Sequence, residues 1–367
     1  MSSALPIEPL ARYLRAQGLA DSDALSVAPL SGGQSNPTFR ISTPDRSYVL
    51  RKKPPGQLMA SAHAIDREYR VMNALQGSNV PVPRMLAYCE DTQIVGTPFY
   101  VMEFLEGRVL VDQSLPGMAP AERGAIYREM NRVIAALHGI DYQALGLETF
   151  GKPGNYFARQ IARWSRQCRE STLPVNSAMQ QLMDWLPAHI PEGDETTLVH
   201  GDYRLDNLVF HATEPRVIGV LDWELSTLGH PLADLSYQCM AWHIPHALWR
   251  GIGGLDLAAL GIPSEAEYVA WYAQATGRDP SEHWDFYMAY NLFRMAAILH
   301  GIAQRAADGS AAAADAEETG RKAGPWLRAV AIRAMDEADG AASSCGEARE
   351  LAAFIASLTP EQFIHLK

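Results

Sequence analysis

The sequence predicts an α+β protein with two lobes. The chain has 367 residues, a length typical of about two domains. Short apolar runs separated by turn residues fill the first third, whereas long stretches with helical periodicity dominate the remainder. We therefore expect a smaller lobe, residues 1–106, with a five-stranded antiparallel sheet and a helix, and a larger, mostly helical lobe, residues 107–367.

The composition excludes several classes of protein. An apolar content of 47% is ordinary for a folded protein, and a net charge of −11 argues against a nucleic-acid partner. The four cysteines are scattered without a Cys-x-x-Cys pair, which predicts reduced thiols rather than structural zinc or a disulfide framework. The sequence shows no signal-peptide pattern and no long apolar stretch, so we expect a cytoplasmic protein without a membrane span. The oligomeric state stays open.

One short region carries the pattern of a reaction centre. An apolar strand at residues 198–199 leads toward Asp202, Asn207 follows five residues later, and a second apolar strand at residues 217–221 ends at Asp222. Phosphoryl transfer uses this set, because one carboxylate positions the attacking hydroxyl while a carboxylate and an amide oxygen hold Mg²⁺. The alternative is a hairpin with ordinary polar turn residues.

This pattern resembles a known family. His-Gly-Asp-x-x-x-x-Asn from His200, followed by Leu-Asp-Trp-Glu ending at Glu224, resembles the aminoglycoside phosphotransferase (APH) enzyme family, whose members have a protein-kinase-like fold. Leu-Ser-Gly-Gly-Gln-Ser-Asn from Leu30 and Val-Leu-Arg-Lys-Lys-Pro-Pro-Gly from Val49 resemble most the kinase-like group also found fused ahead of acyl-CoA dehydrogenase domains. The resemblance is specific for the chemistry and not for the acceptor, since the family phosphorylates antibiotics, sugars, choline-like alcohols and other hydroxyl compounds.

The resemblance implies a role for each residue of the loop. Asp202 would accept or orient the proton of the substrate hydroxyl, and His200 would orient the loop by hydrogen bonding. Asn207 and Asp222 would bind Mg²⁺, which prefers oxygen ligands. Glu224 would reach a second Mg²⁺ through water or remain an exposed acid.

Neighbouring charged residues leave alternatives open. Asp206 competes with Asp202, although its place beside Asn207 suggests that it points elsewhere, for example to Arg204. Arg204 itself either balances phosphate charge or pairs with Asp206. Asp234 matches a family aspartate that holds the catalytic loop from below, so we expect a structural role. His230 stands where relatives usually have the aspartate of Gly-Asp-Pro.

The first lobe begins with a helix and a hairpin. Residues 6–17 form an amphipathic pattern whose apolar face we assign to Ile7, Leu10, Ala11 and Leu14. Strands at residues 27–30 and 38–41 flank a turn rich in glycine and hydroxyl residues. Such a turn lets backbone N–H groups approach phosphate oxygens, or forms a plain hairpin. The predicted phosphate-binding residues of this turn are Ser31, Gly32, Gly33, Gln34 and Ser35.

The next strand and helix supply a cation and an acid. In the strand at residues 48–53, Arg51 matches the family position of the phosphate-binding cation, where many relatives carry Lys, and Lys53 is the fallback. A solvated basic edge strand is the alternative. In the helix at residues 60–75, Glu68 is the expected partner of this cation and Asp66 its rival. We place Glu68 on a different face from the apolar stripe of that helix.

Two further strands, residues 86–89 and 99–104, complete the five-stranded sheet. The segment after them should join the lobes and hold adenine. By family position we assign this contact to the carbonyl of Glu103 and the N–H of Leu105, with Met102 lining the adenine slot or lying in the core.

The second lobe shows helical periodicity at residues 120–138, 155–169, 179–186, 266–275, 283–304 and 322–337. Four residues are candidates for an acceptor pocket, although an aromatic stripe at this spacing also fits a helix core. They are Trp242, Trp271, Tyr290 and Arg294. If Arg294 faces the pocket, an anionic acceptor is favoured.

Together these observations predict a small-molecule kinase that moves the γ-phosphoryl group of ATP to a hydroxyl, with ATP and Mg²⁺ as cofactors. The fused relatives suggest a hydroxyacyl compound as acceptor. The alternatives are an antibiotic kinase and a nucleotide-binding protein without catalysis. The sequence does not identify the acceptor or decide between ATP and GTP.

Overall fold

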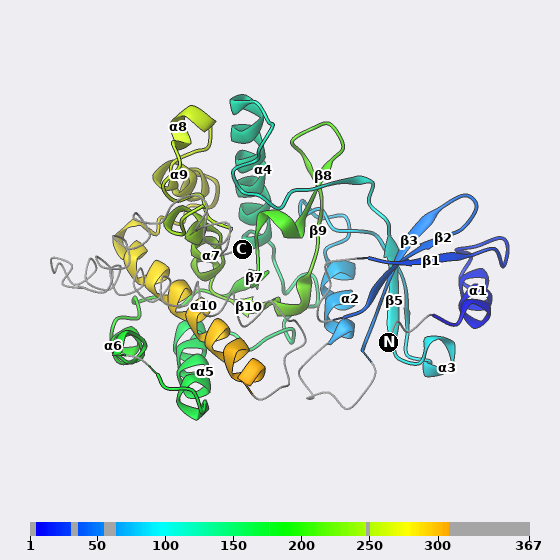
Figure 1. Cartoon of the computed structure of the whole chain (residues 1–367), viewed down its shortest axis with the longest axis horizontal. Helices are drawn as coiled ribbons and strands as arrows, with labels where there is room; N and C mark the ends of the chain where they lie inside the picture. Colours follow the sequence, from blue (N-terminus) through cyan, green and yellow to red (C-terminus); the bar gives the residue numbers. More distant parts are fainter. Residues whose placement is uncertain (1–4, 31–35, 55–63, 176, 247–249, 308–367) are drawn as a thin grey trace. The chain divides into compact units, whose positions relative to one another are not determined.

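The computed structural model describes residues 5–30, 36–54, 64–175, 177–246 and 250–307 (Figure 1). Contacts divide the chain into two compact units. Unit 1 contains the chain up to Val109 together with Asp141–Phe150 and Asp206–Ser226, and unit 2 contains the rest. This grouping differs from a single boundary after residue 106, because the hairpin that follows Asp206 packs with the N-terminal part. The division into functional lobes stays a prediction.

Unit 1 contains the predicted five-stranded antiparallel sheet, in the order β1-β2-β3-β5-β4. In the register of its central strands, Arg51 stands opposite Tyr100 on one side and Thr38 on the other. The α+β fold class and the strand count are therefore confirmed. The strands are β1 Ser26–Pro29, β2 Thr38–Ser42, β3 Ser47–Lys52, β4 Met85–Cys89 and β5 Phe99–Glu103.

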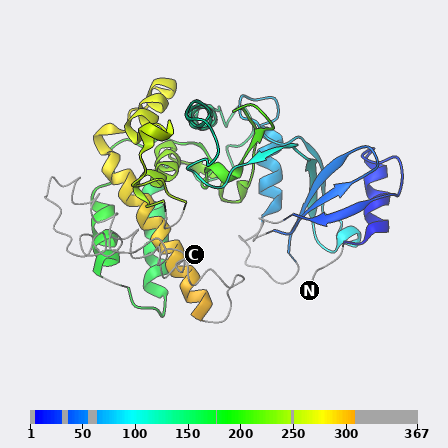
Figure 2. The ribbon, with the colours of Figure 1, turned by 45° about the horizontal axis from the view of Figure 1, so that its top comes forward.

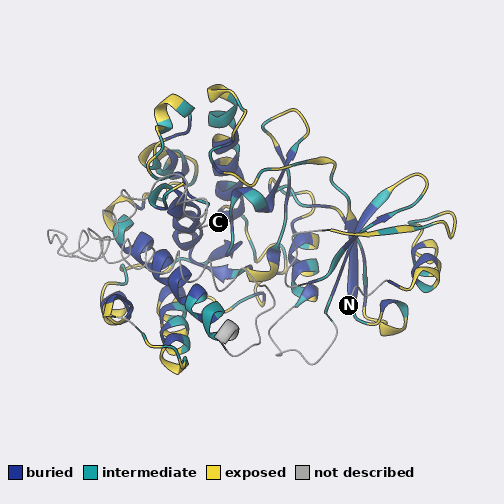
Figure 3. Cartoon of the chain, viewed as in Figure 1, coloured by how far each residue is buried: buried dark blue, intermediate teal, exposed yellow. Residues whose placement is uncertain are grey.

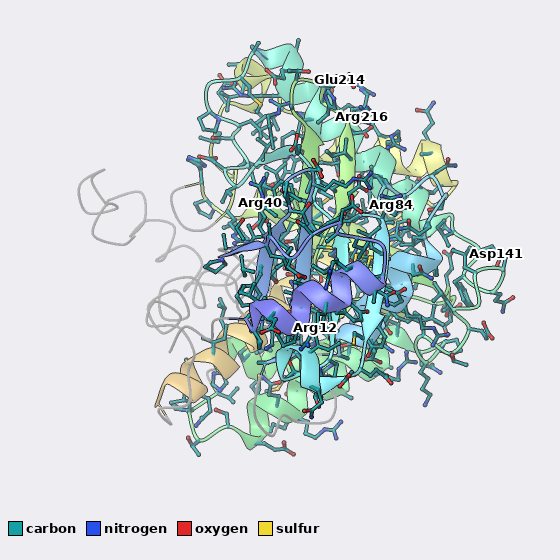
Figure 4. The ribbon with its side chains drawn as sticks, turned by 90° about the vertical axis from the view of Figure 1, so that its right-hand side faces the viewer. Arg12, Arg40, Arg84, Asp141, Glu214 and Arg216 are labelled. Atoms are coloured by element: carbon teal, nitrogen blue, oxygen red, sulfur yellow. The ribbon has the colours of Figure 1, made fainter. Side chains whose placement is uncertain are left out.

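Helices cover both faces of this sheet. Figures 1 and 2 show α1 (Ile7–Ala16) and α2 (Ile65–Ala74) on opposite sides of it. Leu10 and Leu14 of α1 join one apolar core with side chains from β2 and β3, and a short helix, α3 (Thr92–Val95), lies beside α1. We assigned Ile7 to the apolar face of this helix from the sequence, but the residue is 41% exposed in the structure. Arg12, labelled in Figure 4, is on the solvent side of α1.

A second sheet of unit 1 joins β6 (Gly107–Val109), β8 (Leu208–His211) and β9 (Val217–Val220). Strands β8 and β9 form a hairpin whose closed end carries an exposed ion pair between Glu214 and Arg216, both labelled in Figure 4. Gly219 of β9 has no room for a side chain, because Leu105 packs against it. Short 3₁₀ turns lie at Leu205–Asn207 and Trp223–Leu225.

Unit 2 is mostly helical, with one short antiparallel ladder between β7 (Thr197–Val199) and β10 (Thr227–Gly229). Figure 3 shows that α7 and α10, which pack against each other, are the most buried of its helices. The long helix predicted at residues 120–138 is confirmed with these bounds. The helices are α4 Pro120–His138, α5 Tyr156–Glu170, α6 Ser177–Trp185, α7 Pro231–His243, α8 Leu257–Leu260, α9 Glu265–Thr276 and α10 Trp284–Ala307, with 3₁₀ turns at Leu186–Ala188 and Ser281–His283.

The helix predicted at residues 322–337 lies outside the described residues. Among the helices of the described ranges, none combines the length and apolar character needed to cross a bilayer.

Candidate active site

The β8–β9 hairpin brings two predicted metal ligands to its open end. Asn207 directly precedes β8, and Asp222 follows β9 after one intervening residue. The strands pair Leu208 with Val220, and the N–H of Leu221 donates a hydrogen bond to the carbonyl of Asn207 at 2.8 Å. The backbones that carry the amide and the carboxylate therefore lie side by side.

Asp222 has a backbone conformation that few residues other than glycine adopt. Its φ angle is 63°, in the left-handed region, which aspartate tolerates better than most residues. The next residue, Trp223, is fully buried and donates from its indole nitrogen to the carbonyl of Val220 at 2.9 Å. This anchor holds the turn while the Asp222 side chain stays 31% exposed. Backbone strain of this kind is often found where a side chain must be held for function.

Arg51 connects three acidic side chains of unit 1. Its Nε lies 3.0 Å from an oxygen of Glu68, and its Nη2 lies 3.2 Å from Asp222 and 3.7 Å from Glu224. Burial would lower the pKa of Arg51, but the surrounding negative groups, Glu68 foremost, outweigh it and raise this pKa. The acid in contact with the strand cation is thus Glu68, while the rival Asp66 is exposed.

Glu68 is buried, contrary to the face that we assigned to it. It is 1% exposed and lies on the same face of α2 as Ile65 and Met72, because these residues are three and four positions apart. Besides Arg51, Asn36 donates to Glu68 at 2.8 Å and the hydroxyl of Tyr100 at 3.0 Å. Burial raises the pKa of Glu68, and the guanidinium and the two donors act in the opposite direction.

The two lysines beside Arg51 have other contacts. The Lys52 ammonium is buried and donates to the carbonyl of Val95, and burial lowers its pKa. Lys53, the fallback cation, is partly exposed and lies beyond the end of β3. The cation that contacts the helix acid in the structure is therefore Arg51.

The charges of this cluster do not balance within it. Three carboxylates surround one guanidinium, which leaves two negative charges when all four groups are ionised. The carboxylate of Asp222, with Asn207 at the same end of the hairpin, is a set of hard oxygen donors of the kind that Mg²⁺ prefers. No group of three or more His, Cys, Asp or Glu side chains with metal-site geometry occurs in the part of the chain that the structure describes. A Mg²⁺ ion here would keep water and phosphate oxygens as further ligands.

In unit 2, Asp202 is held through both carboxylate oxygens. The hydroxyl of Tyr237 donates to one oxygen, and Nε of Arg204 lies 3.0 Å from the other. Burial, and secondly the Asp202 charge, raise the pKa of Tyr237, so this phenol stays a donor. Arg204 makes an ion pair with Asp202, a partner that the sequence interpretation did not consider. The Asp202 side chain is 15% exposed.

Asp234 ties down the backbone that precedes Asp202. Its carboxylate accepts from the N–H groups of His200 and Gly201 at 2.7 and 2.8 Å, and His138 lies 3.3 Å from it. Burial alone would raise the pKa of Asp234, but the bond to His138 and these N–H donors outweigh it and lower the pKa. The expectation of a structural role agrees with these contacts.

His200 and Arg294 complete the support of this loop. His200 is fully buried, and its Nδ1 accepts from the N–H of Asp202 at 3.2 Å, which is the contact that an orienting role requires. Arg294 is 7% exposed and donates to the carbonyl of Gly201 at 2.7 Å, with its guanidinium over the ring of Tyr237. Arg294 therefore fixes the loop instead of lining an open pocket.

The other acceptor candidates pack against helices of unit 2, Tyr290 fully buried and the two tryptophans partly exposed. Trp242 donates to the carbonyl of Pro263 and makes edge-on and tilted ring contacts with neighbouring tyrosines. Trp271 lies under Arg128, and Tyr290 is fully buried. The core alternative fits these contacts better than the pocket interpretation.

His230, at the position where the sequence comparison expected aspartate, contacts the first turn of α7. Its Nδ1 accepts from the N–H of Leu232 at 3.2 Å and so caps the first turn of α7. Burial lowers the pKa of His230 to about 4. The ring stays neutral and can act as the cap at neutral pH.

The predicted nucleotide contacts are only partly within the described ranges. The phosphate-loop candidates Ser31, Gly32, Gly33, Gln34 and Ser35 lie outside them. Met102 is buried, and the N–H of Glu103 donates to the carbonyl of Arg84 at 2.9 Å. Leu105 packs on Gly219. These contacts fix the segment, and its role toward adenine stays a prediction.

The fold and these contacts define a kinase-like phosphotransferase class. A family model described as phosphotransferase enzyme family, APH, matches residues 26–290. The chain belongs to this family.

Two curated relatives and three solved structures illustrate the range of similarity. Acyl-CoA dehydrogenase family member 10 of Mus musculus is 46% identical over 321 residues, which are 87% of this chain and 30% of that protein. Acyl-CoA dehydrogenase family member 11 of Homo sapiens is 42% identical over 298 residues, 81% of this chain and 38% of that protein. The chain thus spans roughly a third of the length of these relatives.

A solved structure from Ralstonia eutropha JMP134, described provisionally as an aminoglycoside phosphotransferase, is 53% identical with a TM-score of 0.82, covering 93% of this chain and all of that one. The aminoglycoside phosphotransferase APH(4)-Ia, solved with AMP-PNP and hygromycin B, is 17% identical with a TM-score of 0.58 and covers 90% of this chain and 99% of its own. The ethanolamine kinase of Plasmodium vivax is 13% identical with a TM-score of 0.56, and the match covers 89% of this chain and 88% of that one. The last two show the shared protein-kinase-like fold.

Proposed function

We propose that this protein transfers the γ-phosphoryl group of ATP to a hydroxyl group of a small molecule. The observation that carries the proposal is the cluster around Arg51. A buried acid, Glu68, fixes the guanidinium from one side, and the partly exposed Asp222 contacts it from the other. Such a cluster presents a fixed cation for phosphate oxygens and an acid for a metal ion.

The nucleotide and the metal would be held by residues of unit 1. Arg51 would bind phosphate oxygens, together with the backbone of Ser31–Ser35, while Met102, Glu103 and Leu105 would contact adenine. Asn207 and Asp222 would hold Mg²⁺, with Glu224 near it. The ion supplies positive charge against the phosphates during transfer. Asp222 and Glu224 are partly exposed and share one guanidinium with Glu68, and this surplus of acids over cations supports a cationic partner.

Asp202 would position the acceptor hydroxyl and take its proton. Its carboxylate is aimed by Tyr237 and Arg204, and its backbone by Asp234 through the preceding residues. Positioning of this kind contributes much of the acceleration in phosphoryl transfer, because the protein has little covalent chemistry to do.

The acceptor is a hydroxyl compound, and a hydroxyacyl compound is our first candidate because of the acyl-CoA dehydrogenase relatives. An antibiotic is the second, because the Ralstonia eutropha structure of 53% identity carries the provisional description of an aminoglycoside phosphotransferase. A nucleotide-binding protein without catalysis is the contrasting outcome.

Nucleotide binding and turnover test the proposal separately. The midpoint of thermal unfolding should rise with Mg²⁺–ATP and not with Mg²⁺ alone, because a ligand of the native state stabilises it. Asp202→Ala should keep the ATP dissociation constant within about threefold and lose phosphate transfer, whereas Asp222→Ala should also lose Mg²⁺-dependent binding. Asp206→Ala is the matched control, being an acid of the same loop.

The outcomes separate the alternatives. If Asp206→Ala abolishes transfer and Asp202→Ala does not, the base is assigned to the wrong acid. If neither ATP nor GTP shifts the midpoint at millimolar concentration, the fold does not act as a kinase.

A further inference from the structure

A small cavity lies within unit 2, beside the residues that hold Asp202. Its volume is about 30 Å³, enough for roughly two water molecules or the end of a small organic group. The walls are formed by Tyr237, Gln238 and apolar side chains of α7, and by Gln113, Arg204 and Arg250 from outside that helix.

The cavity contains buried amide groups without a partner. Gln238 is 2% exposed, and neither its amide oxygen nor its amide nitrogen finds a hydrogen-bond partner among the described residues. Gln113 is 7% exposed, and its side-chain oxygen is likewise unpartnered within the described ranges. A buried amide without a partner is costly, so two such groups at one cavity require water molecules or a ligand group that pairs with them.

The cavity is one side chain away from the proposed base. Tyr237 and Arg204 both line it, and both bond the Asp202 carboxylate. A molecule that inserts one end here would therefore have the rest of its chain near Asp202. None of the lining residues comes from unit 1, so this relation is internal to unit 2.

The lining selects among end groups. An amide side chain offers both a donor and an acceptor, which complements a planar carboxyl or carboxamide group. Guanidinium groups in the wall favour a carbonyl or carboxylate oxygen and disfavour an ammonium group.

We propose that this cavity is a specificity subsite, in which Gln238 and Gln113 bind a carbonyl-bearing end group of the phosphate acceptor, a carboxylate or a carboxamide. The inference rests on the proposed function, since it makes the ligand the acceptor whose hydroxyl Asp202 positions. Gln238 is the main specificity residue, because both of its side-chain polar atoms lack a hydrogen-bond partner among the described residues.

The test uses a panel of straight-chain hydroxy acids from glycolate upward, the carboxamide of each, and the matched diols without a carbonyl group. Calorimetry without nucleotide measures binding to the full chain, and phosphate transfer from Mg²⁺–ATP is measured separately. Gln238→Met should weaken binding of the acids or amides by about tenfold or more, leave the diols unaffected and leave ATP binding unchanged. Cys239→Ala, a change at the next residue of α7 whose buried side chain is not part of the cavity lining, should alter none of these.

Stability separates recognition from a structural role. Gln238→Met removes an unpartnered amide, so the midpoint of thermal unfolding should not fall; a fall with unchanged acceptor binding would overturn the subsite. Tighter binding of the acids than of their amides would identify a carboxylate as the end group. Tighter binding of the amides would identify a carboxamide. Gln238-dependent binding without phosphate transfer would support the subsite and contradict the proposed function. Transfer to acids, amides and diols alike would support the function and overturn the subsite. If no compound of the panel binds, the subsite is also overturned.

Discussion

Replacing Asp234 tests how the loop before Asp202 is held. In the parent, this carboxylate accepts charge-assisted hydrogen bonds from two backbone N–H groups, on His200 and Gly201, in a fully buried environment. Asp234→Asn keeps the shape but turns an NH₂ group toward one of these donors. A hydrogen bond to a charged group contributes about 1.5–3 kcal/mol, so we expect the variant to lose roughly 2–4 kcal/mol of unfolding free energy.

The same change should affect catalysis more than nucleotide binding. A loop displaced by about 1 Å costs on the order of 100-fold in rate when positioning is the main contribution. We therefore expect kcat to fall by about 100-fold while the ATP dissociation constant changes by less than about threefold. Urea unfolding measures the first effect, and steady-state kinetics with a titration of Mg²⁺–ATP measures the second.

The stability difference should also depend on pH in one direction. The pKa of Asp234 is lowered in the folded protein, so its contribution is complete above the ordinary aspartate range and is lost as the pH falls through the folded pKa. The gap between parent and variant should be constant near neutrality and shrink toward acid.

Cys239→Ala is the matched control, because Cys239 is fully buried on the same helix and has no bond to the loop among the described contacts. If Asp234→Asn is as stable as the parent, or if both variants lower kcat equally, the loop is not held by this carboxylate.

Two further perturbations test the charge arrangement of each unit. Arg51→Met should leave buried Glu68 without its cation and cost roughly 3–5 kcal/mol of unfolding free energy, whereas Arg51→Lys, which keeps the charge but spans fewer acids, should cost clearly less. Urea titrations compare the two, and equal losses would show that the charge does not stabilise Glu68. His230 has a folded pKa of about 4, so the unfolded chain binds more protons between about pH 6.5 and 4, and the parent should lose up to about 3 kcal/mol as the pH falls through this window. His230→Asn keeps a cap acceptor on α7 and should flatten this loss; an unchanged slope would assign the acid sensitivity to other groups.

Periodicity predicted the elements, and short spacing predicted part of the site. The long α4 and the five strands of the sheet could be predicted, because the apolar pattern that defines each of them lies within that one element. The pairing of Arg51 with a helix acid was predicted by resemblance, and the structure distinguishes Glu68 from Asp66 by burial. The face predicted for Glu68 was wrong, because its spacing of three residues from Ile65 and four from Met72 places it on the buried stripe.

The contacts that the sequence did not indicate join residues far apart in the chain. Asn36 and Tyr100 reach Glu68, and His138 reaches Asp234, across separations that no local pattern encodes. Arg204 had a local signal, since it lies two residues from Asp202 with a side chain long enough to return. The acceptor subsite could not be predicted, because an unpartnered glutamine is defined only by what surrounds it.

Arginine at position 51 is explained by the number of acids that surround it. A lysine ammonium is a compact point charge that serves one partner best, whereas a guanidinium offers separate nitrogens in a fixed plane. Here Nε faces Glu68 and Nη2 faces Asp222 and Glu224, so one side chain fixes the helix acid and still contacts the acids of the hairpin. A divalent ion at Asp222 would compete for the same oxygen that Nη2 contacts. Asp222 would hold Mg²⁺ through its carboxylate, and Nη2 of Arg51 would be available for a phosphate oxygen while the Glu68 contact keeps the guanidinium in place.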